Sequence, residues 1–394
     1  MCTIFSRPCQ SVSDFPPAPE QDSQISWLFC IIHLTGGKKS IKIQVENVCI
    51  KFPVLGKDKA RMRNITLKDV AKKAGVSYAT VSRALSGNPH IRPDTRKRVL
   101  EICSEMGYTA NYIARSMVMN KTDLIGLVVP TIDNQFMSEI AYYTEMSART
   151  RGYNIMLCNS EPGPEQELTA VKLLTGRKVD GILIVPQNHN TYKNIKQYTD
   201  MVPVVFLSEN LGNEPMSYVT VDNEYGTKIG MQYLTELGHR DILYFGRRKN
   251  TTHLLRAEGY IRECTRLGLR QIFFDSPYGR SSIEYGYRMA KDLFSRPVDY
   301  TAIFASTDSN AIGIMKAAEE SGIDIPGKIS LLGFDDIGSA SLPKIELTTI
   351  RQPKKEMAVQ AVDILINKIN DRTEAYTHQI LRPDLIERKT CRKL

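Results

Sequence analysis

The stretch from Thr66 to Leu85 reads TLKDVAKKAGVSYATVSRAL and determines the fold of the N-terminal part of the chain. Thr66 can cap a helix whose apolar residues keep the spacing of one buried face: Leu67, Val70, Ala71 and Ala74. Gly75 ends this helix, and Ser77 can cap a second helix from Tyr78 to Leu85. Two short helices joined by a tight glycine turn predict a helix-turn-helix unit.

A third helix is predicted from Pro93, because proline suits the first helical position. Its apolar residues keep a helical period up to Gly107: Val99, Ile102, Cys103 and Met106. The segment is also basic, since residues 63–121 carry 11 basic and 4 acidic side chains, whereas residues 122–394 carry 33 and 34. A local basic block in a foldable segment favours a nucleic-acid partner, and the alternative is an ordinary solvated face.

Residues 1–61 differ from the rest of the chain, because proline and glycine interrupt them and no stretch holds a helical or strand period for long. We interpret residues 1–61 as an extension that is disordered or not native, with Met62 as the natural start. A genuine regulatory arm is the alternative. The apolar run from Ile25 to Leu34 follows acidic residues, unlike an export signal, and it is too short to span a bilayer.

The cysteines indicate the redox environment. All 8 are isolated, without a CxxC pair or clustered histidines, so the spacing of a zinc site is absent. Isolated cysteines in a chain of this size are typical of reduced, mostly buried residues. The sequence therefore predicts a cytoplasmic protein with no metal, no cofactor and no membrane partner.

Beyond Lys121 the pattern changes to short apolar runs separated by helical stretches, which predicts strands connected by crossover helices. The runs are Leu124–Pro130, Asn154–Asn159, Gly181–Pro186, Val202–Ser208, Tyr218–Asp222, Ile242–Gly246, Ile272–Phe274, Ala302–Ser306 and Ser330–Phe334. Their near-continuous hydrophobicity indicates strands that are covered on both faces. We expect a doubly wound α/β domain in two lobes, with ligand sites at the carboxyl ends of the strands.

The helix-turn-helix stretch closely resembles the headpiece of the lactose and galactose repressor (LacI/GalR) family. Further matching segments are Arg96–Val99, Glu105–Tyr108, Asn111, Ala114–Met117, Gly238–Arg240, Arg256–Tyr260, Gly333–Asp336 and Leu347–Pro353. The resemblance spans Ile65 to about Lys389. It implies a DNA-binding domain over residues 62–108 and a hinge over residues 109–122. An effector-binding and dimerisation domain over residues 123–394 follows, with two lobes like those of periplasmic binding proteins.

The resemblance also implies which residues contact DNA. The second helix would lie in the major groove, with Tyr78, Ala79 and Arg83 facing bases; the start of this helix, from Ser77, reaches base edges in such motifs. Side chains assigned to phosphates are Thr66, Lys68, Thr80, Ser82 and Asn111. The hinge residues Ala114, Arg115 and Met117 would enter the minor groove, where Met117 would wedge between base steps. The alternatives are solvated side chains and a hinge helix that merely packs on the sensor domain.

For the effector, the resemblance implies a set of binding residues: Asn134, Phe136, Asp222, Asn250, Thr252, Arg256, Asp308 and Asp335. Carboxylates and an arginine under an aromatic ring suit sugar hydroxyls. Ser208 stands where many relatives carry Asp, which places the usual sugar contacts in doubt. Of the adjacent pair Asp335 and Asp336, we expect one carboxylate to face the cleft, and a turn-capping role for Asp335 is the alternative.

Catalysis finds no support, because GxGxxG, HExxH, GxSxG and the phosphate-binding motif GxxxxGK followed by Ser or Thr are absent from the sequence, and the histidines are scattered. We therefore predict a homodimeric repressor that is not an enzyme. It binds a double-stranded DNA operator and responds to a small-molecule effector, a carbohydrate. Two other classes remain open: a free sugar-binding protein of the periplasmic type, and an α/β enzyme such as a sugar isomerase or kinase.

Overall fold

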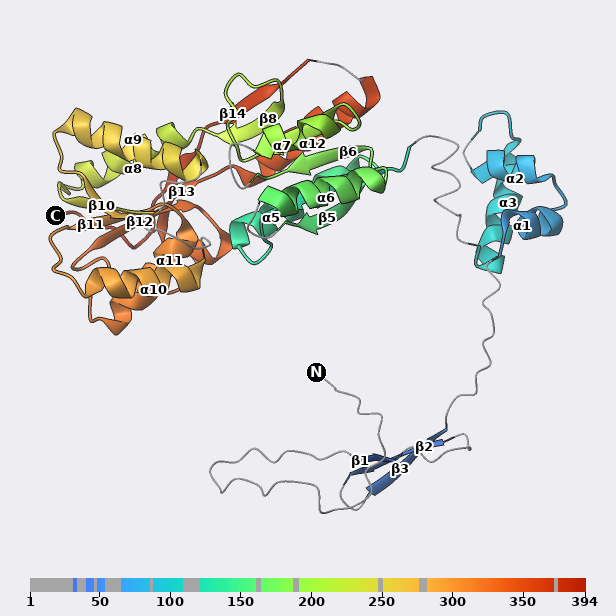
Figure 1. Cartoon of the computed structure of the whole chain (residues 1–394), viewed down its shortest axis with the longest axis horizontal. Coiled ribbons are helices and arrows are strands. Elements are labelled where there is room, and N and C mark those ends of the chain that lie inside the picture. The colour runs from blue at the N-terminus through green and yellow to red at the C-terminus, as the bar shows by residue number, and fades with distance from the viewer. Residues whose placement is uncertain are drawn as a thin grey trace. The chain divides into compact units, whose positions relative to one another are not determined.

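The computed structural model describes residues 31–33, 40–45, 48–53, 65–85, 88–108, 121–160, 164–186, 191–246, 251–275, 282–371 and 375–394. The chain divides into two compact units, residues 1–110 and 111–394 (Figure 1). No helix among the described residues is long and apolar enough to cross a membrane.

The first unit contains the predicted helix-turn-helix headpiece, with helices α1 (Leu67–Ala74), α2 (Tyr78–Leu85) and α3 (Pro93–Met106). Thr66 caps α1 in a reciprocal capping box with Asp69, in which the Thr66 amide donates to the Asp69 carboxylate over 2.8 Å. Gly75 and Gly107 end α1 and α3 with φ of 67° and 64°, a backbone conformation that favours glycine. Val70, Val81 and Val99 join the three helices in one core. The sequence prediction is confirmed for all three helices.

The first unit also contains an antiparallel sheet formed by β1 (Ile31–His33), β2 (Ser40–Val45) and β3 (Val48–Pro53). No strand was predicted within residues 1–61, so this sheet adds to the predicted fold. The sequence SIKIQV alternates polar with apolar residues, which is the period of a strand, and VCIKFP carries Val, Ile and Phe at every second position. These two runs are short, and the prolines and glycines around them interrupt any longer period.

The second unit has two lobes, each built on a six-stranded sheet. The sheet of the N-lobe is parallel, in the order β14-β8-β7-β6-β4-β5. Its strands are β4 (Leu124–Val129), β5 (Asn154–Asn159), β6 (Gly181–Ile184), β7 (Val204–Leu207), β8 (Ser217–Val221) and β14 (His378–Leu381). Its helices are α5 (Gln135–Thr150), α6 (Pro164–Gly176), α7 (Thr191–Thr199) and α12 (Lys354–Asp371).

The sheet of the C-lobe has the order β10-β9-β11-β12-β13-β15, and only β15 runs antiparallel to its neighbour. Its strands are β9 (Ile242–Gly246), β10 (Ile272–Asp275), β11 (Ala302–Ala305), β12 (Ser330–Asp335), β13 (Thr348–Arg351) and β15 (Asp384–Ile386). Its helices are α8 (Asn223–Glu236), α9 (Thr251–Leu267), α10 (Ile283–Phe294), α11 (Asp308–Glu320) and the short 3-10 helix η1 (Gly338–Ser341).

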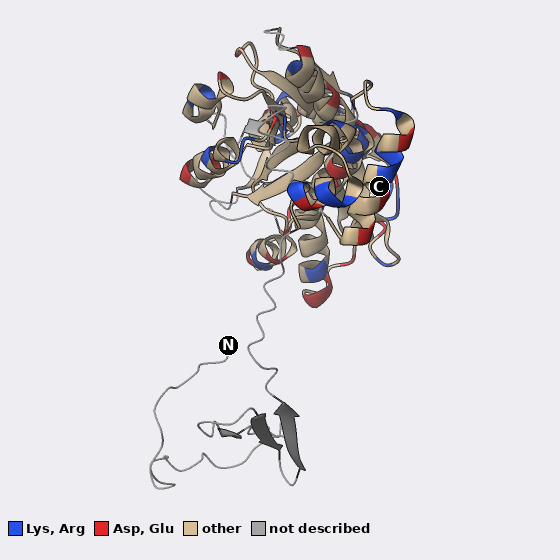
Figure 2. Ribbon diagram, turned by 90° about the vertical axis from the view of Figure 1, so that its right-hand side faces the viewer, with Lys and Arg blue, Asp and Glu red and all other residues tan. Residues whose placement is uncertain are grey.

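The two lobes confirm the doubly wound α/β prediction. The central strands β4, β6, β7, β9 and β11 carry no charged residue, and charge lies mainly on helices and loops (Figure 2). All nine predicted strands are present, but β13, β14 and β15 were missed. β14 is an exposed edge strand and β15 has 3 residues, so neither forms a buried apolar run. The chain passes between the lobes after β8, after β13 and after β14.

Candidate nucleic-acid interface and ligand-binding site

Helix α2 presents one face of the headpiece to solvent. Val81 and Ala84 bury its inner face, whereas Tyr78, Ala79 and Arg83 are exposed and Ser82 is half-buried. Tyr78, at 52 % exposure, is a large aromatic side chain without cover from its own unit. An exposed ring at the start of the helix and an exposed guanidinium in its last turn can both contact DNA in such a motif.

The remaining headpiece predictions fall into three groups. Thr66 and Lys68 are exposed near the start of α1. Ser77 caps α2, because its hydroxyl accepts from the Thr80 amide over 3.1 Å and lies 2.9 Å from the Thr80 hydroxyl. Four predicted contacts lie outside the described residues: Asn111, Ala114, Arg115 and Met117.

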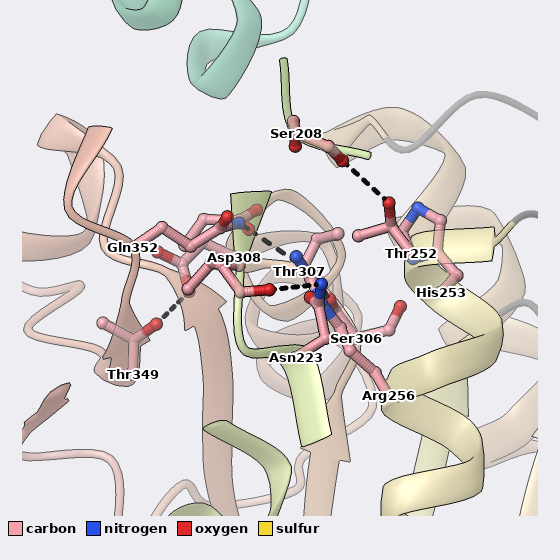
Figure 3. Close-up of polar contacts among 12 residues, drawn as sticks. Ser208, Asn223, Thr252, His253, Arg256, Ser306, Thr307, Asp308, Thr349 and Gln352 are labelled. Carbon is pink, nitrogen blue, oxygen red and sulfur yellow. Dashed lines mark hydrogen bonds and ion pairs between the residues drawn. The ribbon is translucent and has the colours of Figure 1, made fainter. Parts of the chain in front are cut away.

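In the second unit, a buried polar cluster surrounds Arg256 of α9 (Figure 3). The Arg256 Nε donates to Asn223 Oδ1 over 2.8 Å, and Nη1 donates to the Ser306 carbonyl over 2.6 Å. The same Nη1 lies 3.4 Å from Asp335 Oδ1. The guanidinium also lies 3.7 Å from the centroid of the Phe334 ring. Burial lowers the pKa of Arg256 from its ordinary value, and the charge of Asp335 opposes that shift.

Two buried carboxylates complete this cluster. Asp335 accepts from Gln352 Nε2 over 2.6 Å, and burial raises its pKa while Arg256 opposes the rise. Asp308 is fully buried and accepts from the Thr349 hydroxyl over 2.5 Å and from the Ile337 amide over 2.9 Å. Burial, followed by the charge of Asp335, raises the pKa of Asp308 to about 7. The cluster therefore favours a protonated form for one of its two carboxylates near neutrality.

The adjacent Asp336 belongs to a different set of contacts. Its carboxylate pairs with Arg388 over 2.7 Å, whereas the carboxylate of Asp335 points to Arg256. The two adjacent carboxylates therefore point to different partners. A catalytic pair of adjacent carboxylates is not formed by these residues.

Two acceptor atoms in the cluster have no hydrogen-bond partner in the described part of the chain. They are Asn310 Oδ1 and Gln352 Oε1, which belong to residues only 3 % and 1 % exposed. Buried polar atoms are almost always paired, so a ligand or water that donates to these two acceptors would complete the cluster. Sequence reasoning missed Asn223, Asn310 and Gln352. Gln352 lies in the quoted segment Leu347–Pro353, but only the fold shows that its amide meets Asp335.

Other predicted effector residues lie around this cluster rather than in it. Phe136 is buried on α5, and Thr252 at the start of α9 donates to the Ser208 carbonyl of the N-lobe over 3.1 Å (Figure 3). Asn134 caps α5 by accepting from the Met137 amide, and Asp222 caps α8 by accepting from the Tyr225 amide. Asn250 lies outside the described residues.

Asp222 borders a shallow hollow between α8 and α9 instead of contacting Arg256. Its neighbour Asn223, the first residue of α8, takes that contact, while the Asp222 carboxylate is engaged in capping the helix. Among the described residues, no group of three or more His, Cys, Asp or Glu is placed to hold a metal ion.

Comparison with known proteins relates this chain to one family. Residues 66–111 match the family of bacterial regulatory proteins named after lacI, and residues 231–391 match a periplasmic binding protein-like domain. Catabolite control protein A of Priestia megaterium is 31 % identical over 312 residues, which are 79 % of this chain and 94 % of that protein. The ribose operon repressor of Escherichia coli is 32 % identical over 82 % of this chain and 98 % of that repressor.

Among solved structures, a lac repressor dimer bound to operator and an anti-inducer superposes with a TM-score of 0.75. The aligned part is 28 % identical and covers 83 % of this chain and 99 % of that one. The likeness therefore includes the headpiece and both lobes.

Proposed function

We propose that this chain, which belongs to the LacI family of bacterial regulatory proteins, is a repressor whose affinity for a DNA operator is set by a small molecule. The observation that carries this function is a helix-turn-helix with an outward-facing α2, joined in one chain to a two-lobed α/β unit with a buried polar site. The protein acts in the cytoplasm and has no catalytic role.

The DNA contacts that we propose are divided between reading and positioning. Arg83 reads a guanine through a two-pronged hydrogen bond, and Tyr78 and Ala79 contact neighbouring base edges. The side chains that position the headpiece on phosphates are Thr66, Lys68, Thr80, Ser82 and Asn111, and Ser77 contacts DNA at the start of α2. The exposure of Tyr78, Ala79 and Arg83 on one face of α2 supports this division.

The effector that we propose is a sugar bound beside Arg256 and Asp335. The unpartnered acceptors of Asn310 and Gln352 suit hydroxyl donors, and the buried carboxylates and Ser306 carbonyl add further acceptors. The relationship to the ribose operon repressor supports a sugar as well. Phe136 and Thr252 close the site from its two sides.

Two copies of the chain bind one operator in this proposal. A dimer places two α2 helices on half-sites one helical turn apart, which raises affinity because the second headpiece binds at high effective concentration. The related lac repressor was solved as a dimer on its operator. Residues 62–108 form the headpiece, residues 109–122 the hinge and residues 123–394 the effector and dimerisation domain.

The test is selection of bound duplexes from a random DNA pool by the full chain, with and without a panel of sugars and nucleobases. We expect a palindromic consensus whose recovery changes with at least one sugar. Product formation from a sugar together with no DNA shift would replace this function with an enzymatic one. A consensus that responds only to a nucleobase would keep the repressor and refute the sugar.

A further inference from the structure

The two lobes of the second unit contact each other between the start of α5 and the 3-10 helix η1. The Gly338 amide donates to Glu139 Oε1 over 2.8 Å, and the Ser339 hydroxyl donates to Gln135 Oε1 over 2.5 Å. A Cβ atom on Gly338 would lie only 2.8 Å from the Gln135 amide nitrogen. The C-lobe therefore sits directly on the first turns of α5, and a side chain at position 338 would have to displace the Gln135 amide.

Lys354 connects this contact to the turn after β12. It is the first residue of α12, next to one of the chain crossings between the lobes, and it is only 7 % exposed. Its ammonium donates to the carbonyls of Asp335 and Asp336 over 2.8 and 2.5 Å and pairs with Glu139 over 3.1 Å. An ammonium has three donors, and each of these has an acceptor here.

The turn that Lys354 holds is strained. Asp335 has a φ of 133° and Asp336 a φ of 51°, both in the range that residues with a side chain rarely adopt. Such a conformation persists only where surrounding contacts hold it. The Asp335 side chain belongs to the Arg256 cluster, while its carbonyl is bound by Lys354. The turn formed by Asp335 and Asp336 therefore connects the Arg256 cluster to the Lys354 ammonium.

We propose that Lys354 is the positioning residue that couples the Arg256 cluster of the C-lobe to helix α5 of the N-lobe, with Glu139 as its partner across the lobes. This inference rests on the proposed function, because it assigns a route to the regulation of that site. A ligand that shifts Asp335 moves the carbonyls of Asp335 and Asp336 and so changes their hydrogen bonds to the Lys354 ammonium. This in turn alters the ion pair with Glu139 and the hydrogen bond from the Gly338 amide to Glu139. The state of the site is thereby reported to the N-lobe.

A purely stabilising ion pair is the competing explanation. Buried ion pairs contribute little net stability compared with apolar replacements, so stability alone does not account for this arrangement. The two explanations differ in linkage. If Lys354 couples the site to the rest of the regulator, operator binding must change the protection of the η1 amides, and that change must depend on Lys354.

The experiment is hydrogen–deuterium exchange on the full chain, followed at the peptides that cover residues 336–341. We compare the parent, Lys354→Met, Glu139→Gln and the double variant, each with and without an operator duplex isolated from the random pool. Methionine keeps the length of the lysine stem beside Phe136 and removes the charge. Matched controls are Lys355→Met, the exposed neighbour on α12, and Glu145→Gln, whose carboxylate lies on the exposed side of α5.

Without DNA, each single variant should speed exchange at residues 338–339 by roughly tenfold, the factor expected from losing one charge-assisted hydrogen bond. The double variant should exceed the faster single variant by no more than about twofold, because both changes remove one interaction. Operator should alter this exchange in the parent and both controls but not in Lys354→Met.

The coupling would be overturned by any of three results. These are unchanged exchange in Lys354→Met, exchange in the double variant that equals the product of the two single effects, and an operator response that persists in Lys354→Met. Failure of the proposed function is a different result, because the parent would then shift no duplex in the binding assay.

Discussion

Replacing Arg256 by methionine is expected to weaken the fold as well as the effector response. Arg256 is 3 % exposed and donates to Asn223 and to the Ser306 carbonyl while neutralising Asp335. Methionine fills part of the same volume beside Phe334 but supplies no donor. The variant therefore leaves two buried acceptors and one buried carboxylate without their principal partner.

The expected loss in free energy of unfolding follows from these contacts. Removing one partner of a buried, hydrogen-bonded ion pair costs about 3–5 kcal/mol, because the other charge stays buried. A domain of this size loses about 2–4 °C in Tm for each kcal/mol, so the melting temperature should fall by roughly 10 °C. Asp335→Asn in the same chain removes the uncompensated charge, so the double variant should recover at least about half of the loss.

Urea unfolding with a fixed m value measures this change. Arg262→Met is the matched control, because Arg262 lies on the same helix and its side chain is 53 % exposed in its pair with Glu224. That control should cost no more than about 1 kcal/mol. Equal losses in the Arg256 and Arg262 variants, or no recovery with Asp335→Asn, would refute the reasoning from burial.

Three further predictions concern other parts of the chain. In gel-shift titrations at fixed salt, Arg83→Ala should cost about 1–3 kcal/mol on the selected operator and relax one base pair, whereas Lys68→Ala should weaken all duplexes alike; indistinguishable behaviour would contradict the division of contacts. Burial lowers the pKa of His239 below its ordinary 6.5, so the unfolded state binds more protons than the folded state at low pH. The free energy of unfolding should therefore fall as pH drops below 6.5. His239→Gln should reduce this pH dependence in urea titrations. Met117→Ala should weaken operator binding and reduce bending in a circular-permutation assay, whereas Met117→Leu should match the parent; equal bending by all three would make residues 109–120 a plain linker.

The headpiece could be predicted from sequence almost completely, because local signals there agree with the tertiary structure. Thr66 and Gly75 bound α1 by capping, and Pro93 begins α3 at the position that tolerates a missing N–H. Each of these signals acts within a few residues. No contact between distant segments is needed to find where these helices begin and end.

The candidate ligand site could be predicted only in part, because its geometry depends on which distant strands are neighbours. Arg256, Asp308 and Asp335 do meet, as the resemblance implied. Asn223 and Gln352 join them from two of the three segments at which the chain crosses between lobes. The segments that cross between lobes have no helical or strand period. The sequence near Asn223 and Gln352 therefore does not indicate that their side chains belong to a site. The hairpin of residues 40–53 was missed for a different reason, since each of its strands is only 6 residues long.

The burial of the cluster constrains how any effector can act. Asp308 is fully buried with both carboxylate oxygens engaged by Thr349 and Ile337, and Arg256 is held by three partners. A ligand can reach these groups only by displacing contacts that hold the C-lobe together, and it must return equivalent hydrogen bonds. The unpartnered acceptors of Asn310 and Gln352 provide such compensation without a loss elsewhere. Ligand binding and rearrangement of the cluster therefore occur together. The ligand shifts the equilibrium between two arrangements of the lobes only by the difference in its affinity for them.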